Sequence, residues 1–303
     1  MQAARQAKEL TFSPGCDRAS ATGMWRAVLI MFVAMSFVPA GDLAGKILTG
    51  IYGAHPLFVA WSRFAIGALL VLPFVSGGVW VLLKDWRIWF RGTLLAGGVS
   101  CIQAALRTEP LADVFAAFFI APILSFVLSV LFLRERATLL RALLVGLGFI
   151  GVLLVVRPGM GGSAALLWAV VAGVFYGAFL TTSRWLANQG SAIELSFTQM
   201  LIAALILLPL GMPQMPDMSL DVFGLTMASA LGSMLGNLLL IVAYRMAPAT
   251  ILAPLVYFQL IAATALGWIV FADLPDPITW AGLAMILFAG LASAVSMRVS
   301  KAA

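Results

Sequence analysis

The feature that most constrains this chain is its succession of long apolar stretches, separated by charges, glycines and prolines. In a lipid bilayer every backbone N–H and C=O must find its partner within the chain, and a helix of about 20 apolar residues spans the hydrocarbon core. Ten stretches of roughly this length are present, and each predicts one transmembrane helix. The predicted helices cover residues 25–46, 56–76, 88–107, 111–133, 138–157, 163–184, 192–211, 221–244, 249–271 and 278–298.

The composition agrees with burial in lipid and argues against several other classes of protein. Charged residues make up 10% of the 303 residues, whereas soluble domains carry about 25%. Cys16, Cys101 and the single histidine, His55, provide neither a disulfide framework nor metal-ligand spacing, so we expect no metal and no cofactor. The formal net charge of +6 arises from basic residues at helix ends. It therefore indicates membrane topology rather than nucleic-acid binding.

Basic residues are distributed unequally between the two predicted sides of the membrane. With the N-terminus inside, fourteen lysines and arginines fall inside and three outside (Lys46, Arg107 and Arg157), while Arg63 lies within a helix. Because cytoplasmic segments carry the excess of basic residues, we expect both termini in the cytoplasm and His55 and Asp217 on the outer face of the cell inner membrane. The first apolar stretch continues past a proline to Lys46, so we interpret it as a retained helix rather than a cleaved signal peptide.

The two halves of the chain resemble each other at an offset of about 138 residues. The offset places Phe37 over Phe175, Lys46 over Arg184, Gly98 over Gly236, Pro110 over Pro248 and Glu135 over Asp273. In the second helix the offset is 136, and PLFVAWSRFAIGALLVLPF lies over AIELSFTQMLIAALILLPL. A chance match of apolar segments would not bring prolines and charges into register as well. Five helices per half predict an inverted repeat, the architecture of alternating-access transporters. The predicted organisation is a tail at 1–24, repeats at 25–159 and 160–299, and a tail at 300–303.

One segment carries a more specific pattern. Residues 110–113 read Pro-Leu-Ala-Asp, and Pro122, Glu135, Gly146, Gly151 and Arg157-Pro158-Gly159 follow. This pattern resembles the EamA domain of the drug/metabolite transporter superfamily, and Arg63 in WSRF matches an arginine common in the second helix of that family. The second half is a weaker copy, in which Asp273 replaces the glutamate and Ala249-Thr250-Ile251 replaces Leu-Ala-Asp. The resemblance implies a secondary transporter of amino acids, S-adenosylmethionine, riboflavin, carnitine-like amines, metallophores or drugs.

Charged residues inside predicted helices are the first candidates for a binding site, because each costs roughly 2.5–3.5 kcal/mol in a bilayer unless it is paired or hydrated. Asp42 and Lys46 share one face of the first helix, Arg63 lies in the second, and Arg107, Glu109 and Asp113 follow the third. In one interpretation, Arg63 or Lys46 binds a substrate carboxylate or phosphate, and Asp42 binds an amine or a proton. Asp42 is then the expected resting partner of Arg63, and Glu109 is a second proton-coupling candidate. In the other interpretation, these charges form a salt-bridge network that includes an Asp42–Lys46 pair.

Uncharged polar residues and prolines add further candidates. The polar side chains within apolar stretches are Gln103, Tyr176, Thr181, Thr182, Gln199, Ser233, Asn237, Tyr257 and Gln259. Most such groups bridge helices. Asn237, Tyr257 and Gln259 are preferred as substrate ligands because the resemblance places the eighth and ninth helices at the cavity. Trp61 could stack on a planar substrate. Pro39, Pro122 and Pro254 could kink helices and act in gating, or could simply be tolerated.

The pattern as a whole favours a transporter over the alternatives. The sequence contains no phosphate-binding loop, which argues against ATP as the driving force. An intramembrane enzyme needs a catalytic set near the interface, and His55 alone does not supply one. An accessory subunit or a channel gains nothing from an inverted repeat. We therefore expect a monomer or homodimer, without nucleic acid or cofactor, whose partners are the lipid bilayer and a small-molecule substrate.

Overall fold

The computed structural model describes residues 21–132, 139–157, 163–186, 189–246 and 253–302. These residues form helices joined by turns, and within them there is no strand. The longer helices are α2 (Ala21–Gly50), α3 (Pro56–Val71), α5 (Trp86–Leu106), α6 (Leu111–Phe118), α7 (Ile120–Phe132), α8 (Leu139–Val156), α9 (Leu166–Trp185), α10 (Ala192–Gly211), α11 (Leu220–Met246), α13 (Phe258–Phe271) and α14 (Pro277–Ala302). The shorter ones are η1 (Leu72–Phe74), α4 (Val79–Leu82), η2 (Met212–Gln214) and η3 (Ala253–Tyr257).

Every predicted apolar stretch overlaps a described helix, with three differences at the level of elements. Within the described residues helix α2 begins at Ala21, whereas the first predicted helix begins at residue 25. The fourth predicted helix is two helices, α6 and α7, and the ninth is η3 followed by α13. Most of the predicted tail, together with Glu135 and residues 249–251, lies outside the described residues.

The helices have the length and surface of membrane spans. By length and composition, six described helices can cross a membrane: Trp25–Gly50, Pro56–Phe74, Leu111–Phe132, Leu166–Ser183, Ile193–Gln214 and Leu220–Leu240. Three shorter apolar helices accompany them, at Ala142–Val156, Leu255–Phe271 and Pro277–Ala292. Large apolar side chains such as Phe74, Ile269 and Phe288 are exposed on the outside of the molecule. An exterior of this kind suits lipid and not water.

Local sequence signals explain where several helices begin. Pro56 occupies the first turn of α3, and the His55 Nδ1 atom accepts a hydrogen bond from the Leu57 N–H at 3.2 Å. Asp85 caps α5 by accepting from the Arg87 N–H at 2.9 Å. Ser191 begins α10 with a reciprocal capping box. Each cap satisfies backbone donors that the first turn of a helix leaves unpaired.

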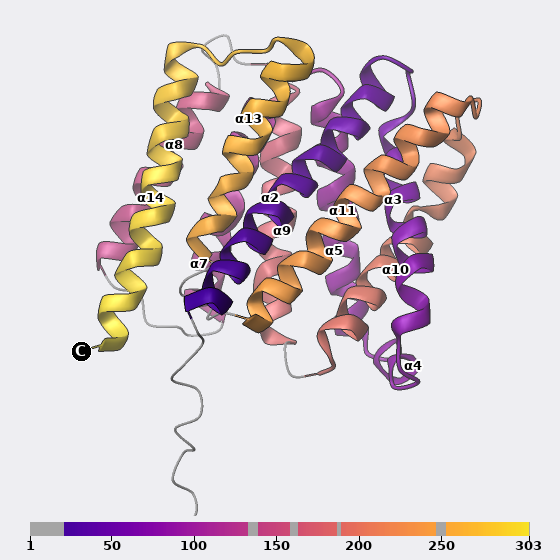
Figure 1. The fold of residues 1–303 in the computed structure, drawn as a ribbon, viewed down its shortest axis with the longest axis horizontal. Helices are drawn as coiled ribbons and strands as arrows, with labels where there is room; N and C mark the ends of the chain where they lie inside the picture. Colours follow the sequence, from indigo (N-terminus) through magenta and orange to yellow (C-terminus); the bar gives the residue numbers. More distant parts are fainter. Residues whose placement is uncertain (1–20, 133–138, 158–162, 187–188, 247–252, 303) are drawn as a thin grey trace, which may run out of the picture.

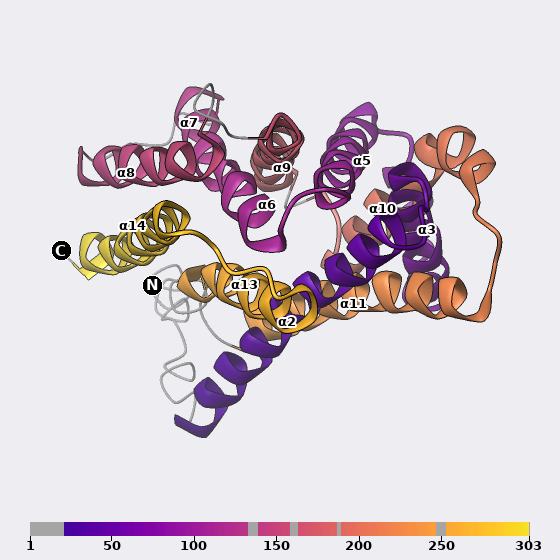
Figure 2. The ribbon, with the colours of Figure 1, turned by 90° about the horizontal axis from the view of Figure 1, so that it is seen from above.

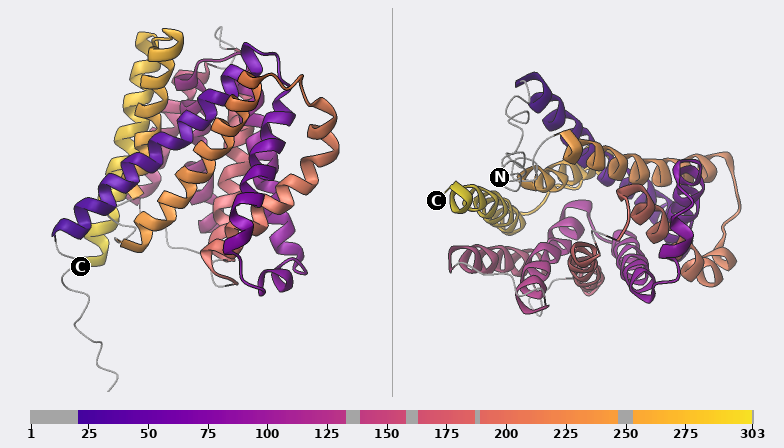
Figure 3. Two further views of the ribbon diagram at one scale, coloured as in Figure 1. Left: turned by 45° about the vertical axis from the view of Figure 1, so that its right-hand side comes forward. Right: turned by 90° about the horizontal axis from the view of Figure 1, so that it is seen from below.

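The helices form two facing rows that meet at both ends (Figures 1, 2 and 3). Seen from above in Figure 2, one row contains α8, α6–α7, α9 and α5, and the other contains α14, α13, α2 and α11. Helices α3 and α10 pack together at one end of the rows, and α8 packs against α14 at the other. Helices α2 and α9 run in opposite directions in Figure 1, and the described chain begins and ends at the same end of the molecule.

The most extensive helix contacts are preserved when the two halves of the chain are exchanged. Helix α2 packs along α11, and its counterpart α9 packs along α5. Helix α13 packs on α2 just as α6 and α7 pack on α9, and α3 contacts α11 just as α10 contacts α5. The contacts α3–α10, α8–α14 and α6–α13 map onto themselves. This exchange is what a chain built from two related five-helix units produces.

Glycines allow close backbone contact between α2 and α11 and between α9 and the α6–α7 segment. A Cβ atom at Gly232 of α11 would lie 2.8 Å from the Gly41 Cα of α2. On α9, a Cβ at Gly173 would lie 2.8 Å from the Phe118 carbonyl oxygen, and one at Gly177 would lie 2.7 Å from the Ala121 carbonyl oxygen. Small residues of this kind let membrane helices approach closely.

The three prolines selected from the sequence occupy different settings. Pro39 is buried inside the continuous helix α2. Pro122 lies in the first turn of α7, and the residue four positions before it, Phe118, is the last residue of α6. Because a proline ring excludes the carbonyl four residues earlier, Pro122 accounts for the break between α6 and α7. Pro254 lies in η3, ahead of α13.

Candidate functional site

A buried ion pair joins the first two long helices. Arg63 of α3 donates through Nη1 to the Asp42 Oδ1 of α2, which is the pairing expected from the sequence. Both side chains are buried. The second terminal nitrogen, Nη2, donates to the Ser233 Oγ of α11. Arg63 therefore connects two helices of the first half with one of the second.

A fourth side chain completes this site from α5. The Gln103 Nε2 atom donates to the Asp42 Oδ1 at 3.1 Å, and Gln103 is fully buried. An ionised carboxylate only accepts hydrogen bonds, so Gln103 presents its amide nitrogen to Asp42 and its oxygen elsewhere. That oxygen, Oε1, has no hydrogen-bond partner among the described residues. We call Asp42, Arg63, Gln103 and Ser233 the central polar cluster.

Helix α11 contributes a row of polar side chains next to this cluster. Ser229 Oγ donates to the Gly41 carbonyl of α2 at 2.9 Å, and Ser233 Oγ donates to the Ser229 carbonyl at 3.0 Å. One turn further on, Asn237 Nδ2 donates to the Ser233 carbonyl at 2.8 Å. Asn237 therefore adjoins the cluster, but its amide nitrogen bonds to its own helix.

Lys46 does not pair with Asp42, although the two residues are four apart on one helix. Its Nζ donates to the Glu109 carbonyl at 2.6 Å and to the Leu106 carbonyl at 3.4 Å, and it lies 5.1 Å from the centre of the Phe271 ring. The end of α5 leaves carbonyls without helical partners, and a cation satisfies them. Since Asp42 is bound by Arg63 and Gln103, the alternative Asp42–Lys46 pair is not formed.

Acidic residues gather at the end of the molecule where α2 finishes, the upper end in Figure 1. Asp113, at the start of α6, is in electrostatic contact with Asp276, Glu109, Arg157 and Asp273. Arg157 donates to both carboxylate oxygens of Asp276, at 2.5 and 2.6 Å, and Glu109 accepts from Ser163 Oγ at 2.6 Å. This Arg157–Asp276 pair is largely exposed, unlike the buried pair of the central polar cluster.

The other sequence candidates lie away from the central polar cluster. Trp61 is half-buried, packs on Gly211 at the end of α10, and lies 6.2 Å from the Phe58 ring. Tyr257 stacks on Phe119 with ring centres 5.1 Å apart. Gln259 is half-buried on α13, and Arg107 is exposed. The structure thus brings Arg63 and Asp42 together, with Asn237 adjoining, and places Trp61 and Tyr257 in packing contacts elsewhere.

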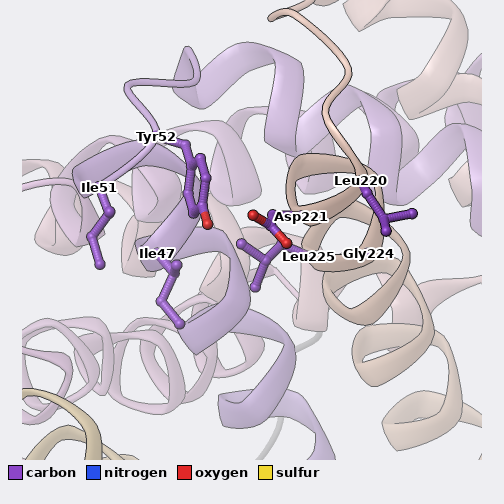
Figure 4. Close-up of a pocket in the computed structure, with 7 residues that line it drawn as sticks. All are labelled: Ile47, Ile51, Tyr52, Leu220, Asp221, Gly224 and Leu225. Carbon is purple, nitrogen blue, oxygen red and sulfur yellow. The ribbon is translucent and has the colours of Figure 1, made fainter.

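An open groove of about 490 Å³ lies at the upper end, between the end of α2 and the start of α11 (Figure 4). Its lining consists of Ile47, Ile51, Tyr52, Leu220, Asp221, Gly224 and Leu225. Figure 4 shows Tyr52 and Asp221 turned towards each other across it. No residue of the central polar cluster lines this groove, so the cluster is closed off from it in this conformation.

Comparison with known proteins decides the family. The sequence profile of the EamA-like transporter family matches the chain twice, over residues 25–157 and 163–294. The chain belongs to the EamA-like transporter family. It therefore contains the EamA domain twice, as the repeat and the Arg-Pro-Gly pattern predict.

Relatives within this family are named for the movement of small molecules. The S-adenosylmethionine uptake transporter of Rickettsia felis is 27% identical over 244 residues, which cover 78% of this chain and 82% of that protein. The pseudopaline exporter CntI of Pseudomonas aeruginosa is 28% identical over 240 residues, covering 77% and 84%. The riboflavin transporter of Brucella anthropi is 25% identical over 271 residues, covering 86% and 95%.

The same fold occurs in a protein of known crystal structure that is 19% identical, with a TM-score of 0.63 over 90% of this chain and 98% of that one. Together with the six apolar helices, the family membership makes this chain a multi-pass membrane protein and a transporter of small molecules. The relatives' names are those of transporters and not of enzymes.

Three residues of this EamA-like transporter were not selected as site residues from the sequence. Gln103 and Ser233 stood among many polar residues within apolar stretches, and nothing in the sequence set them apart from helix-bridging groups. Arg91 was counted among the basic residues of the inner side, yet its side chain is buried between α5, α9 and α10. Only the packing of the helices distinguishes these three residues from other residues of the same type in the sequence.

Proposed function

We propose that this chain is a secondary transporter that moves a small zwitterionic organic solute across the cell inner membrane by alternating access. The observation that carries the proposal is the central polar cluster: a buried ion pair contacted by both halves of the chain, with an unpartnered acceptor beside it. In inverted-repeat transporters the substrate site lies near the midplane where the repeats meet. Arg63, which is paired with Asp42, donates to Ser233 of the second repeat, so the cluster joins the two repeats.

The chemistry of the cluster suits a solute that carries both a carboxylate and an amine. A guanidinium binds a carboxylate with two parallel hydrogen bonds, so an incoming carboxylate can replace Asp42 on Arg63. Asp42 and the Gln103 Oε1 atom then accept hydrogen bonds from the amine. A buried acceptor without a partner costs about 1–3 kcal/mol, which a bound donor would recover. S-adenosylmethionine, which has an α-amino carboxylate, is the first candidate and other amino acids are further ones; riboflavin, which carries neither group, is the candidate that this chemistry favours least.

The proposed topology has ten membrane spans as two inverted five-helix repeats, at 25–159 and 160–299, with tails at 1–24 and 300–303 in the cytoplasm. Fourteen of the 18 basic residues then lie on the cytoplasmic side. The exchange-symmetric helix contacts and the opposite directions of α2 and α9 support the inverted arrangement. We propose that the transporter acts as a monomer or homodimer without a cofactor.

Two proline-containing segments provide the movement. One is the α6–α7 break, which packs on glycines of α9, and the other is the turn of α2 that contains Pro39, three residues before Asp42. Loss of the Arg63–Ser233 bond on substrate binding would let α11 shift relative to α2 and α3. Asp42 is the proposed coupling group, since its carboxylate is exchanged between Arg63, the substrate and a proton; Glu109 is a second candidate.

Uptake into proteoliposomes tests the proposal. Purified protein should take up radiolabelled S-adenosylmethionine or methionine saturably, with riboflavin as a third probe. Arg63→Ala should abolish uptake, and Arg63→Lys should lower it because a point charge replaces the two-bond fork. Asp42→Asn should change the pH dependence. Arg157→Ala is the matched control, because it breaks an Arg–Asp pair that is exposed, and it should retain most uptake.

Two results would contradict the proposal. Full uptake by a well-expressed Arg63→Ala protein would remove the central polar cluster from the binding site. Absence of uptake for all three probes and a wider set of amino acids would favour the alternatives of an accessory subunit, a channel or an intramembrane enzyme.

A further inference from the structure

A second buried arginine, Arg91, lies near the beginning of α5, away from the central polar cluster. Arg91 of α5 is 7% exposed; its Nε donates to Ser183 Oγ of α9 at 2.8 Å and its Nη1 to the Leu195 carbonyl of α10 at 2.9 Å. Its guanidinium lies 4.8 Å from the centre of the Phe179 ring. Arg91 and Gln103 are twelve residues apart on α5, or about 18 Å at 1.5 Å per residue.

Among the described residues, the hydrogen bonds of Arg91 go to neutral groups and none of the ion pairs includes it, although the Tyr176 phenol interacts electrostatically with its guanidinium. A buried guanidinium without a carboxylate is costly in a membrane protein, and a hydroxyl, a carbonyl and an aromatic face compensate it only in part. By contrast, Arg87, one turn earlier, is paired with Asp85 and lies over Trp185. Arg91 is therefore a buried cation that can still bind an anion.

Helix α10, which Arg91 contacts, carries a buried acceptor without a partner among the described residues. Helix α5 carries another such acceptor beside Asp42. Gln199 of α10 is 9% exposed, and its Oε1 has no hydrogen-bond partner among the described residues. It lies one turn beyond Leu195, on the face of α10 whose Ile202 contacts Gly92 of α5. Among the described residues, Gln103 Oε1 and Gln199 Oε1 are the two buried side-chain oxygens without partners. Gln103 bonds to the Asp42 that pairs with Arg63, and Gln199 lies one turn from the Leu195 carbonyl that Arg91 binds.

The internal repeat relates one residue of each cluster, Arg63 and Gln199, and places Arg91 over a neighbour of the central polar cluster. At the offset of 136 residues Arg63 lies over Gln199, and at 138 residues Arg91 lies over Ser229, one turn from Ser233. The helix pairs that carry them, α2–α11 and α9–α5, exchange when the halves are exchanged. In an inverted repeat, a group that faces one side of the membrane in the first half has a counterpart in the second half that faces the opposite side.

We propose that Arg91, with Ser183 and Gln199, forms a second solute-binding station, which receives the carboxylate of the transported solute when the site opens towards the Lys84 side of the membrane. Arg91 binds the carboxylate, and Gln199 Oε1 accepts from the amine, as Arg63 and Gln103 do at the central polar cluster. The station deepens the proposed function and rests on it. Among the described residues it differs in having no resident carboxylate, so the solute supplies the counter-charge.

A binding experiment tests the station without requiring transport. Full-length protein carrying Arg63→Gln, in nanodiscs of phosphatidylcholine, is dialysed against radiolabelled methionine and, separately, inorganic phosphate. Saturable methionine binding should remain in this protein and should fall by about tenfold or more when Arg91→Gln is added, the factor expected for loss of a charge-assisted hydrogen bond. Adding Arg87→Gln instead is the matched control, and it should leave the binding unchanged.

Sided transport separates this inference from the proposed function. In proteoliposomes, Arg91→Gln should raise the KM for solute presented on the Lys84 side by about tenfold and leave the KM on the Asp217 side within about twofold. A purely structural role would change both sides and lower the unfolding temperature. If Arg91→Gln does not fold, Arg91→Lys, which keeps the charge and loses the fork, should show the same one-sided change.

The station would be overturned if the Arg63→Gln protein bound no methionine, or if it bound methionine equally with and without Arg91. It would also be overturned if the protein bound phosphate but not methionine, or bound methionine only in nanodiscs that contain anionic lipid. Absence of uptake by the wild-type protein together with Arg91-dependent methionine binding would instead contradict the proposed transport and leave the station standing.

Discussion

At the residue scale, Asp42 shows how packing selects among partners that sequence alone makes equivalent. Lys46 lies one helical turn away on the same face, whereas Arg63 is 21 residues distant on another helix. The free carbonyls at the end of α5 attract Lys46, and Gln103 fills the remaining space at the carboxylate. This space exists because residue 45 is a glycine: a Cβ there would lie 2.5 Å from the Gln103 Oε1.

Gly45→Ala should therefore weaken substrate binding without changing any charge. The added methyl group displaces the Gln103 amide from Asp42, and we expect the KM for uptake to rise by about tenfold, the loss of one hydrogen bond to a charged group. Gly146→Ala is the control, because a Cβ there meets nothing within 4 Å. An unchanged KM in Gly45→Ala would show that Gln103 takes no part in binding.

At the element scale, α2 and α11 meet at Gly41 and Gly232 through backbone atoms, so at this point no flexible side chain can absorb a change. Gly232→Ala would place a Cβ 2.8 Å from the Gly41 Cα, so the two helices must separate. Overpacking of this kind costs about 1–3 kcal/mol, and we expect a lower thermal unfolding midpoint and reduced uptake. Gly224→Ala, on the same helix with nothing within 4 Å, should leave both unchanged. Equal midpoints for the two variants would contradict the tight contact.

At the scale of the whole molecule, the proposed orientation places Asp217 outside and Lys84 inside, and both side chains are exposed. In a protein without Cys16 and Cys101, a cysteine at Asp217→Cys should react in intact cells with a membrane-impermeant maleimide. A cysteine at Lys84→Cys should react only after permeabilisation, because the positive-inside rule keeps its loop in the cytoplasm. The reverse pattern would show that the proposed topology is inverted.

The sequence by itself determined the helical architecture, the internal repeat and the family of this protein. Inside lipid a long apolar stretch has one way to satisfy its backbone, so ten such stretches predicted helices that the described structure contains at the same places. The glycines at close helix contacts and the break near Pro122 could also be anticipated, because their effects are local.

Only the tertiary structure decided which polar groups act together. The partners of Asp42 come from α3 and α5, those of Arg63 from α2 and α11, and those of Arg91 from α9 and α10. A charge at the start of a membrane helix can extend to the interface or turn into the bundle, and the sequence around Arg91 is the same in both cases. The choice depends on how neighbouring helices rotate against one another, and that rotation is a property of the packed molecule.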